Sequence, residues 1–416
     1  MPTIASSTLA NGLPLHRVGL DGTRSVTILA AFDAGARTER REENGMAHFL
    51  EHLVFKGGEK FPHYSDVNDT AERLGGQINA YTSHDLVAFH ITVRAEAAMD
   101  AIDLLTDFAG RPHIDAEELD RERGVVIQEI QRAKDQPASV AENLIDRAAF
   151  GDHPLGRPVL GPEEHLRTFT RDAIVAFRNR RWAGAHGGAF IVGNLDHVEA
   201  NGAVGELFER FPTLPEPEPF DPAPPFEPGV IVEERDTNQS HLRMSYRPQI
   251  DVTSTAQRSA MSIYSTLLGG SMSSRLFDEI REQRGLAYSV YAESHAHADV
   301  QLLQLSAGLD STKCIEAYAR MREIVTELRD NGPTVDEVDR ARAYAAGRRV
   351  LWFENTHNVA RYAAAQAIVL GESIDPDGLI AALDAVTLDE VTEVARDVAD
   401  TLAVACVGPH SAGDFD

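Results

Sequence analysis

Apolar side chains at alternating positions predict strands in both halves of the chain. Val87, Phe89, Ile91 and Val93 occupy every second position, as in a strand that places one face in a core. Short apolar runs bounded by glycine or polar turn residues predict further strands. The expected strands lie at residues 25–34, 78–82 and 86–93, and again at 240–246, 287–293, 300–307 and 402–407.

Helices are expected between these strands and after them. Asp115, followed by Glu118 three positions later, resembles a capping box and predicts the start of a long helix that continues to about residue 133. Two glycine pairs, Gly75-Gly76 and Gly269-Gly270, interrupt the chain before the next expected strand or helical segment. The expected helices that matter most cover residues 46–55, 115–133 and 256–268, with a further segment at 275–284 and helices dominating up to residue 400.

Closely spaced prolines set residues 212–229 apart from the rest of the chain. Proline lacks a backbone donor and favours extended geometry, so this segment predicts a stiff linker. It divides the chain into a first domain, residues 1–211, and a second, residues 230–416. Because both halves show a similar order of elements, we expect an internal duplication and an α+β fold. Its two similar α/β-sandwich halves would have mostly antiparallel sheets and form a clamshell.

Length and charge restrict the functional classes. The chain has 416 residues, more than one core usually organises, which favours two domains of roughly 200 residues. Its formal charge of −26 argues against nucleic acid and anionic membrane surfaces as partners. The same charge would attract cationic ligands such as basic peptides, although an acidic surface can also serve solubility alone.

Cysteine content and hydropathy suggest a compartment. The only cysteines are Cys314 and Cys406, and the amino terminus shows neither a basic leader nor an apolar signal core. The longest apolar runs are too short, or too often interrupted by charges, to cross a bilayer. We therefore expect a cytoplasmic protein without a membrane span.

Candidate chemistry appears in the segment His48-Phe49-Leu50-Glu51-His52. Two imidazoles four residues apart lie on one face of a helix and can bind the same metal ion. Glu51 can point toward that ion without binding it, as the base for a metal-bound water must. Apolar neighbours indicate a buried helix, in which unpartnered polar side chains would be costly. The alternative is that both histidines are simply packed or solvated residues.

A catalytic zinc ion usually has three protein ligands, so the two histidines need a third. The long helix after Asp115 offers Glu122 and Glu129, which are two helical turns apart and therefore on the same face. One of them could bind the metal while the other supports it. Both could also belong to a solvated stripe of the helix.

Together these motifs resemble the pitrilysin and insulinase family of metallopeptidases, and in particular its short two-domain bacterial members related to the mitochondrial processing peptidase. The His-x-x-Glu-His order is that of the inverzincins. The resemblance extends over nearly the whole chain. It rests on Gly35-Ala36-Arg37, His48 to His52, Phe55-Lys56-Gly57, Gly75-Gly76, Asn79-Ala80, Glu122, Glu129, His153-Pro154-Leu155-Gly156, Gly193-Asn194, Ser274-Arg275-Leu276 and Arg284-Gly285-Leu286-Ala287-Tyr288.

The resemblance implies a role for each residue of the motif. It implies that His48, His52 and Glu129 bind one Zn²⁺ ion per chain. It also implies that Glu51 is the general base and that Glu122 is a supporting carboxylate. The separation of His52 and Glu129 along the chain agrees with the family pattern.

Two further pairs are implied by the same resemblance. The strand with Asn79 and Ala80 is similar to the family's edge strand, to which an extended peptide adds through main-chain hydrogen bonds. Alternatively, Asn79 only completes a turn or strand end. Arg281 and Tyr288 match a pair that reaches the substrate and the developing oxyanion. Without the resemblance, they would be interpreted as a surface arginine and a core tyrosine.

The implied function is a zinc-dependent endopeptidase that hydrolyses unfolded peptides in an enclosed chamber without a covalent intermediate. The resemblance also implies a homodimer, with a heterodimer as the alternative. Two other functions remain open. One is a non-catalytic scaffold or partner subunit of the same fold, and the other is a dedicated maturation protease for a ribosomal peptide.

Overall fold

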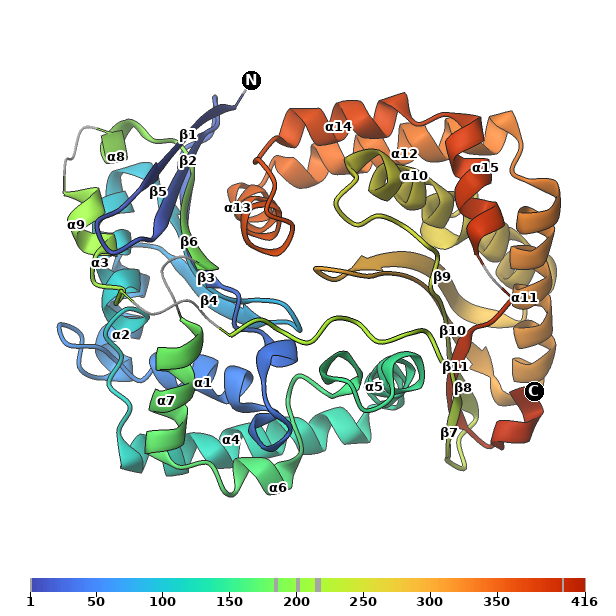
Figure 1. Cartoon of the computed structure of the whole chain (residues 1–416), viewed down its shortest axis with the longest axis horizontal. Helices are drawn as coiled ribbons and strands as arrows, with labels where there is room; N and C mark the ends of the chain where they lie inside the picture. The colour runs from blue at the N-terminus through green and yellow to red at the C-terminus, as the bar shows by residue number, and fades with distance from the viewer. Residues whose placement is uncertain (1, 183–185, 200–202, 214–217, 399, 416) are drawn as a thin grey trace. The chain divides into compact units, whose positions relative to one another are not determined.

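A computed structural model describes residues 2–182, 186–199, 203–213, 218–398 and 400–415 (Figure 1). Contacts divide the chain into two compact units. Unit 1 comprises Met1–Ile130, Pro158–Asp221 and Trp352–Asp377. Unit 2 comprises Gln131–Arg157, Pro222–Leu351 and Gly378–Asp416. Each unit therefore takes most of its residues from one half of the sequence and one segment from the other half.

Residues 131–157 belong to unit 2 and residues 352–377 to unit 1, because two long helices cross the boundaries between the units along the chain. Helix α4 (Ala116–Asp135) begins in unit 1 and ends in unit 2, and helix α12 (Val335–Phe353) does the reverse. The chain also passes from unit 1 to unit 2 within the predicted linker 212–229. There, residues 218–229 form neither helix nor strand, and residues 214–217 lie outside the described part. The division into sequence domains 1–211 and 230–416 stays a prediction.

Unit 1 contains a six-stranded sheet in the order β1-β2-β6-β3-β5-β4. All neighbouring strands are antiparallel except β2 and β6. Strand β4 therefore has one free edge within this sheet. The strands are β1 (Thr3–Thr8), β2 (Pro14–Gly19), β3 (Ser25–Phe32), β4 (Gln77–Thr82), β5 (Val87–Arg94) and β6 (Gly187–Gly193).

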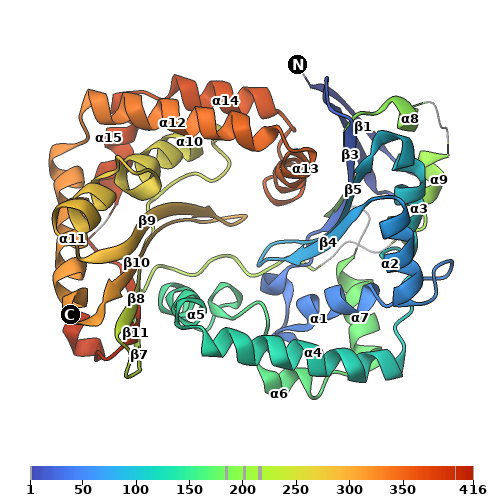
Figure 2. The ribbon, with the colours of Figure 1, turned by 180° about the vertical axis from the view of Figure 1, so that it is seen from behind.

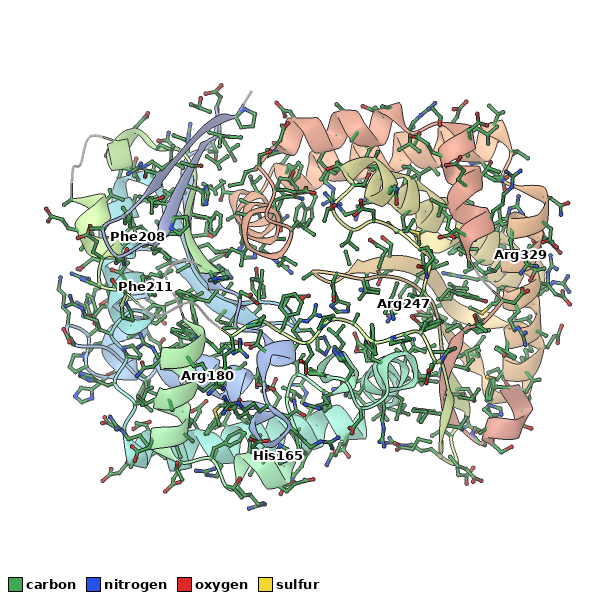
Figure 3. The ribbon with its side chains drawn as sticks, viewed as in Figure 1. His165, Arg180, Phe208, Phe211, Arg247 and Arg329 are labelled. Carbon is green, nitrogen blue, oxygen red and sulfur yellow. The ribbon has the colours of Figure 1, made fainter. Side chains whose placement is uncertain are left out.

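Helices cover both faces of this sheet, which explains why β3 is buried along nearly its whole length. On one face, Phe32 stacks on Trp182 at 5.1 Å in the main core, and Phe208 and Phe211 join this core (Figure 3). On the other face, Thr27 is hydrogen bonded to Thr356 at 2.8 Å. The helices are α1 (Met46–Val54), α2 (Tyr64–Arg73), α3 (Ala98–Phe108), α4, α6 (Glu163–Leu166), α7 (Arg171–Arg181), α8 (Asp196–Glu199), α9 (Val204–Phe208) and α13 (Thr356–Ala364).

Unit 2 contains a five-stranded sheet in the order β7-β11-β8-β10-β9. Helices α10, α11 and α15 pack on one face, and α5 packs on the other (Figure 2). The strands are β7 (Val230–Glu234), β8 (Gln239–Tyr246), β9 (Ala287–Ala296), β10 (Gln301–Asp310) and β11 (Ala403–Gly408). The helices are α5 (Pro137–Phe150), α10 (Thr255–Ser265), α11 (Cys314–Asn331), α12, α14 (Pro376–Ala385) and α15 (Leu388–Asp397), with π-helical turns at Thr266–Gly270 and Phe277–Gln283.

The two sheets repeat one topology. The order β2-β6-β3-β5-β4 in unit 1 corresponds to β7-β11-β8-β10-β9 in unit 2, and in each case only the first pair is parallel. Each sheet also receives a helix on one face, α13 or α5, from the segment that the other half of the sequence contributes. The predicted α+β class is confirmed, and the repeated topology supports the internal duplication. Among the described residues, no helix is long and apolar enough to cross a membrane.

Candidate metal centre

Helix α1 carries His48, Glu51 and His52, and its start is held by a buried carboxylate. The helix begins after Gly45, whose φ of 98° lies in the left-handed region, and a Cβ there would lie 2.7 Å from the Leu160 carbonyl oxygen. No polar N-cap side chain is present. Instead, Glu39 accepts hydrogen bonds from the backbone N–H groups of Ala47 at 2.7 Å and Gly45 at 2.9 Å. A carboxylate at this position satisfies helix donors that would otherwise be unpaired.

The segment before α1 has further contacts within unit 1. Arg180 donates to the Glu43 carboxylate at 2.6 Å, and His165 Nδ1 donates to the Asn44 carbonyl at 3.3 Å (Figure 3). Burial raises the pKa of Glu39 to about 8, although its hydrogen bonds act in the opposite direction. These contacts fix where α1 starts and therefore where its two histidines lie.

The two histidines of α1 and Glu129 of α4 converge on one point. Glu129 Oε2 lies 3.8 Å from His48 Nε2 and 3.5 Å from His52 Nε2. One ligand atom from each residue lies within 4.8 Å of the others. Two ligands that are each about 2.0–2.2 Å from a tetrahedral zinc ion are about 3.4 Å apart, so the three side chains fit such an ion. Glu129 is the most open of them, with 44% of its side chain exposed.

The histidine rings are in states suited to metal binding. Burial, with a contribution from neighbouring His52, lowers the pKa of His48 to about 3, so its imidazole is neutral. Its Nδ1 is buried and lacks a hydrogen-bond partner among the described residues. The Nδ1 of His52 donates to Glu122 Oε1 at 2.8 Å, and its Nε2 faces Glu129. Burial lowers the pKa of His52, but the hydrogen bond to Glu122 and the nearby carboxylates outweigh this effect and raise it, so a metal ion would take the place of the Nε2 proton. A histidine ligand held by a carboxylate on its other nitrogen is a common arrangement in zinc sites.

Glu122 takes a different position from Glu129. It is buried, contacts His52 with one oxygen and forms an ion pair with Lys56 through the other. Burial alone would raise its pKa, but hydrogen bonds from His52 and Lys56 outweigh this effect and lower it. The carboxylate is therefore charged and occupied by two donors. Of the two roles left open for the glutamates of α4, the contacts place Glu129 at the convergence point and Glu122 behind His52.

Glu51 lies on α1 next to the edge strand. The Thr82 hydroxyl of β4 donates to Glu51 Oε2 at 2.5 Å. Burial raises the pKa of the Glu51 carboxyl, and the nearby Glu129 charge adds to this, whereas the Thr82 hydrogen bond and His52 lower it. A carboxylate that is buried, oriented by a hydroxyl and adjacent to three metal-ligand candidates can act as a proton acceptor there.

Asn79 and Ala80 lie on β4, opposite His90 and Phe89 of β5. The backbone N–H of Ala80 donates to Asn79 Oδ1 at 2.9 Å. Ser83 N–H donates to the Leu86 carbonyl, and hydrogen-bonded pairs alternate in an antiparallel ladder, so Ala80 points its N–H away from β5. Asn79 is exposed. On the edge strand, the Ala80 N–H is therefore bound only by the adjacent Asn79 side chain among the described residues.

Arg281 and Tyr288 lie in unit 2 and contact each other. The Arg281 guanidinium lies 5.9 Å from the centre of the Tyr288 ring and 4.7 Å from that of Phe277. Tyr288 is 83% exposed, so the interpretation as a core tyrosine is wrong. Arg281, from the π-helical turn Phe277–Gln283, and Tyr288, near the start of β9, form a partly exposed pair of a cation and a phenol.

Three residues of the site were not among the predicted ones: Glu39, Lys56 and Thr82. Lys56 had a signal in the sequence, because it belongs to the segment Phe55-Lys56-Gly57 on which the family resemblance rests, although it lies just after the end of α1. Glu39 had none, since it caps α1 from outside the standard capping positions. Thr82 reaches Glu51 only because α1 packs against β4.

Comparisons with known proteins agree with these observations. Residues 20–163 match a family model described as Insulinase (Peptidase family M16), and residues 168–344 match one described as Peptidase M16 inactive domain. The chain is 33% identical over 407 residues to an uncharacterized zinc protease of Streptomyces coelicolor, covering 95% of this chain and 87% of that protein. It is 29% identical over 408 residues to the uncharacterized zinc protease YmxG of Bacillus subtilis, covering 97% of each.

The fold is shared with solved structures. A protease from Helicobacter pylori matches with a TM-score of 0.90 and 20% identity, over 98% of this chain and 100% of that one. A structure from Pseudomonas fluorescens, titled as a peptidase M16 inactive domain, matches with a TM-score of 0.90 and 18% identity, over 98% and 99% of the two chains. From the family models, the sequence relatives and the fold together, we conclude that this chain belongs to the insulinase family, peptidase family M16.

Proposed function

We propose that this chain is a zinc-dependent endopeptidase with His48, His52 and Glu129 as metal ligands. The convergence of both Nε2 atoms on the Glu129 carboxylate, with the Glu51 carboxylate beside them, carries this proposal. The relatives named as zinc proteases support the choice of metal and of reaction class. The complete set of ligands and base argues against the alternative of a scaffold subunit.

The protein groups would divide the work of hydrolysis as follows. When bound, zinc supplies a Lewis acid that polarises a carbonyl and acidifies a water molecule. Glu51 takes the proton from that water and later returns it to the leaving amine. The hydrogen bond from Thr82 holds the Glu51 carboxylate in place. Glu122 holds the ring of His52, and Lys56 balances the charge of Glu122.

We propose unfolded peptides as substrates because the edge strand β4 lies next to the base. A peptide can add to such an edge only if its own backbone donors and acceptors are free. The Ala80 N–H, which does not pair with β5, is the candidate donor to the peptide. Asn79→Ala should then have a small effect on KM, whereas Ala80→Pro, which removes the donor, should raise KM. Equal KM values for both variants would contradict this binding mode.

The simplest test of the proposed function uses the purified full-length chain and a diverse mixture of peptides. We expect cleavage products that disappear on treatment with a zinc chelator and return when zinc is added, because the metal supplies the Lewis acid. The products, identified by mass spectrometry, also give the cleavage preference. Absence of cleavage with stoichiometric zinc bound would favour the scaffold function. Cleavage of a single peptide from the mixture would favour a dedicated maturation protease.

We also propose that Arg281 and Tyr288 act on the substrate, as the family resemblance implies. Tyr288→Phe removes one hydroxyl donor and should lower kcat/KM by roughly 10²-fold if that donor stabilises the oxyanion. Zinc content should not change, since neither residue belongs to the proposed zinc ligands His48, His52 and Glu129, which are all in unit 1. Tyr291→Phe, on the same strand and 36% exposed, is the matched control. An unchanged kcat/KM in Tyr288→Phe would show that the Tyr288 hydroxyl has no role in the reaction.

A further inference from the structure

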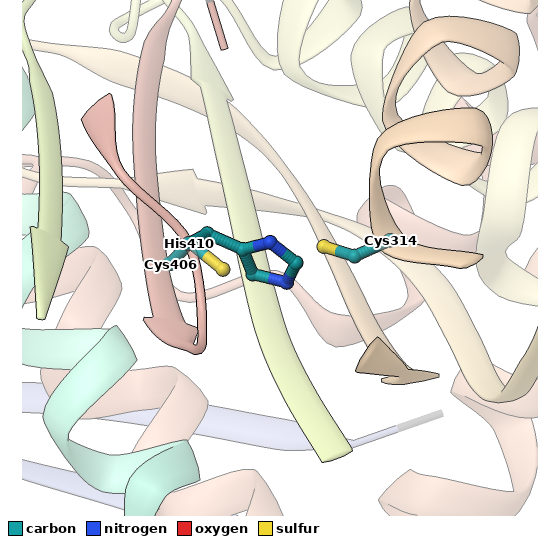
Figure 4. Close-up of side chains that lie close together, drawn as sticks. All are labelled: Cys314, Cys406 and His410. Carbon is teal, nitrogen blue, oxygen red and sulfur yellow. The ribbon is translucent and has the colours of Figure 1, made fainter. Parts of the chain in front are cut away.

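The two cysteines of the chain lie together with a histidine in unit 2, far along the sequence from the centre described above. Cys314 is the first residue of α11, Cys406 lies on β11, and His410 follows that strand (Figure 4). One ligand atom from each of the three lies within 4.8 Å of the others. Both cysteines are fully buried, and His410 is partly buried.

The fold builds this cluster from three separate elements. The sulfur atoms of Cys314 and Cys406 lie within 4.8 Å of each other and of one ring nitrogen of His410. The Ser240 side chain of β8 is the neighbour of this group. Its hydroxyl lies 2.7 Å from His410 Nε2. In metal sites, the ring nitrogen of histidine that does not bind the metal usually has a hydrogen-bond partner. Ser240 is therefore placed to orient the ring, as Glu122 orients that of His52.

Close packing at the end of β11 allows the histidine to reach the thiols. A Cβ on Gly408 would lie 2.4 Å from Ser240 Oγ and 3.1 Å from His410 Cδ2, so a side chain at 408 would displace both groups. The His410 ring also meets Phe415, with 5.9 Å between ring centres. Phe415 is held by a hydrogen bond from the Tyr318 hydroxyl to its carbonyl, at 2.8 Å. The segment after β11 thus closes over the cluster.

We propose that Cys314, Cys406 and His410 form a second metal site, selective for a thiophilic d¹⁰ ion such as Zn²⁺ or Cu⁺. Thiolates and imidazole are the ligands that these ions prefer, and three such side chains occur in known zinc sites. Binding replaces the two thiol protons with bonds to the metal and releases the protons to solvent. A bound ion would link α11, β11 and the segment after β11, because each of them contributes one ligand. The contrasting interpretation is a pair of cysteines that merely pack as small apolar residues.

Cobalt provides a selective probe of this site. Cobalt(II) bound by thiolate shows sulfur-to-metal charge-transfer absorption in the near ultraviolet, and ligation by imidazole and carboxylate alone does not. Because the chain has no other cysteine, any such band must come from Cys314 or Cys406. We expect a band that saturates by two equivalents in the reduced full-length chain, when both proposed sites are filled, and that is absent from a variant with both cysteines changed to serine. Displacement of cobalt by Zn²⁺ or by Cu⁺, compared at equal concentrations, identifies the preferred ion.

Changing two buried cysteines could impair folding, so two further variants test the site with both cysteines in place. His410→Ala, at a partly buried position, should weaken cobalt binding by at least about tenfold while keeping both thiols. His241→Ala on β8, opposite Val407 of β11 and outside the cluster, is the matched control and should bind as the unchanged chain does. His48→Ala should leave the band intact, which separates this site from the proposed catalytic centre. Absence of the band in the unchanged chain, or equal affinity in His410→Ala, would overturn the proposal.

Discussion

Glu51→Gln is expected to lower the rate of peptide hydrolysis by about 10²- to 10⁴-fold, the usual contribution of a general base. The substitution keeps the size of the side chain and an oxygen that can accept the hydrogen bond from Thr82. It removes only the ability to take a proton. The measurement is kcat with a peptide identified from the mixture, together with zinc content from metal analysis.

Zinc content decides how a loss of rate in Glu51→Gln is interpreted. The carboxylate of Glu51 is not part of the converging ligand group, so zinc should remain bound. Glu117→Gln, at the exposed start of α4, is a matched control that makes the same chemical change away from the site. A rate within a few-fold of the unchanged chain would show that Glu51 is not the base. Loss of zinc along with activity would instead make Glu51 part of the metal site.

His48→Ala, His52→Ala and Glu129→Gln are each expected to abolish hydrolysis and to weaken zinc binding more strongly than Glu122→Gln does. The first three remove an atom that would bind the metal, whereas Glu122 acts through His52 Nδ1. Loss of a residue that orients a ligand typically costs 10- to 100-fold in metal affinity, which sets the expected value for Glu122→Gln, about 10- to 100-fold. Competition with a chromophoric chelator measures these affinities.

Two features of the molecule shape this experiment. The proposed thiolate site would hold a second ion, so zinc is best compared in a background with Cys314 and Cys406 changed to serine, or as a difference of one equivalent. Lys56→Met is a useful companion to Glu122→Gln, because it removes the cation paired with Glu122 but keeps the carboxylate on His52. Full zinc affinity in Glu129→Gln would place the third ligand elsewhere, with Glu122 as the first candidate.

The local elements that the sequence predicted are present with small errors at their ends, whereas strands β1, β2, β6 and β7 were not predicted. The helix expected at 46–55 is α1 (Met46–Val54), and the one expected at 115–133 is α4 (Ala116–Asp135). The strand expected at 402–407 is β11 (Ala403–Gly408). The helix expected at 256–268 ends three residues early as an α-helix and continues as a π-helical turn. Periodicity and capping are properties of neighbouring residues, so a single sequence contains them.

The residues of the candidate metal centre were also predicted from the sequence, but the separate roles of its two glutamates were not. The spacing of His48, Glu51 and His52 within one helix makes their shared face a local property. For α4, the same argument placed Glu122 and Glu129 on one face but did not assign their roles. The contacts of His52 with both carboxylates distinguish them, and these contacts depend on how two helices distant in sequence pack together.

The sequence by itself determined the α+β class, the repeated order of elements and the residue types that could hold a metal ion, because each depends on short-range spacing. Only the tertiary structure decided that residues 131–157 and 352–377 exchange between the two units, and that Glu39 caps α1. It alone also brought Cys314, Cys406 and His410 together. These features rest on contacts between residues far apart in the chain. No periodicity in the sequence encodes such contacts, since they form only when whole elements pack.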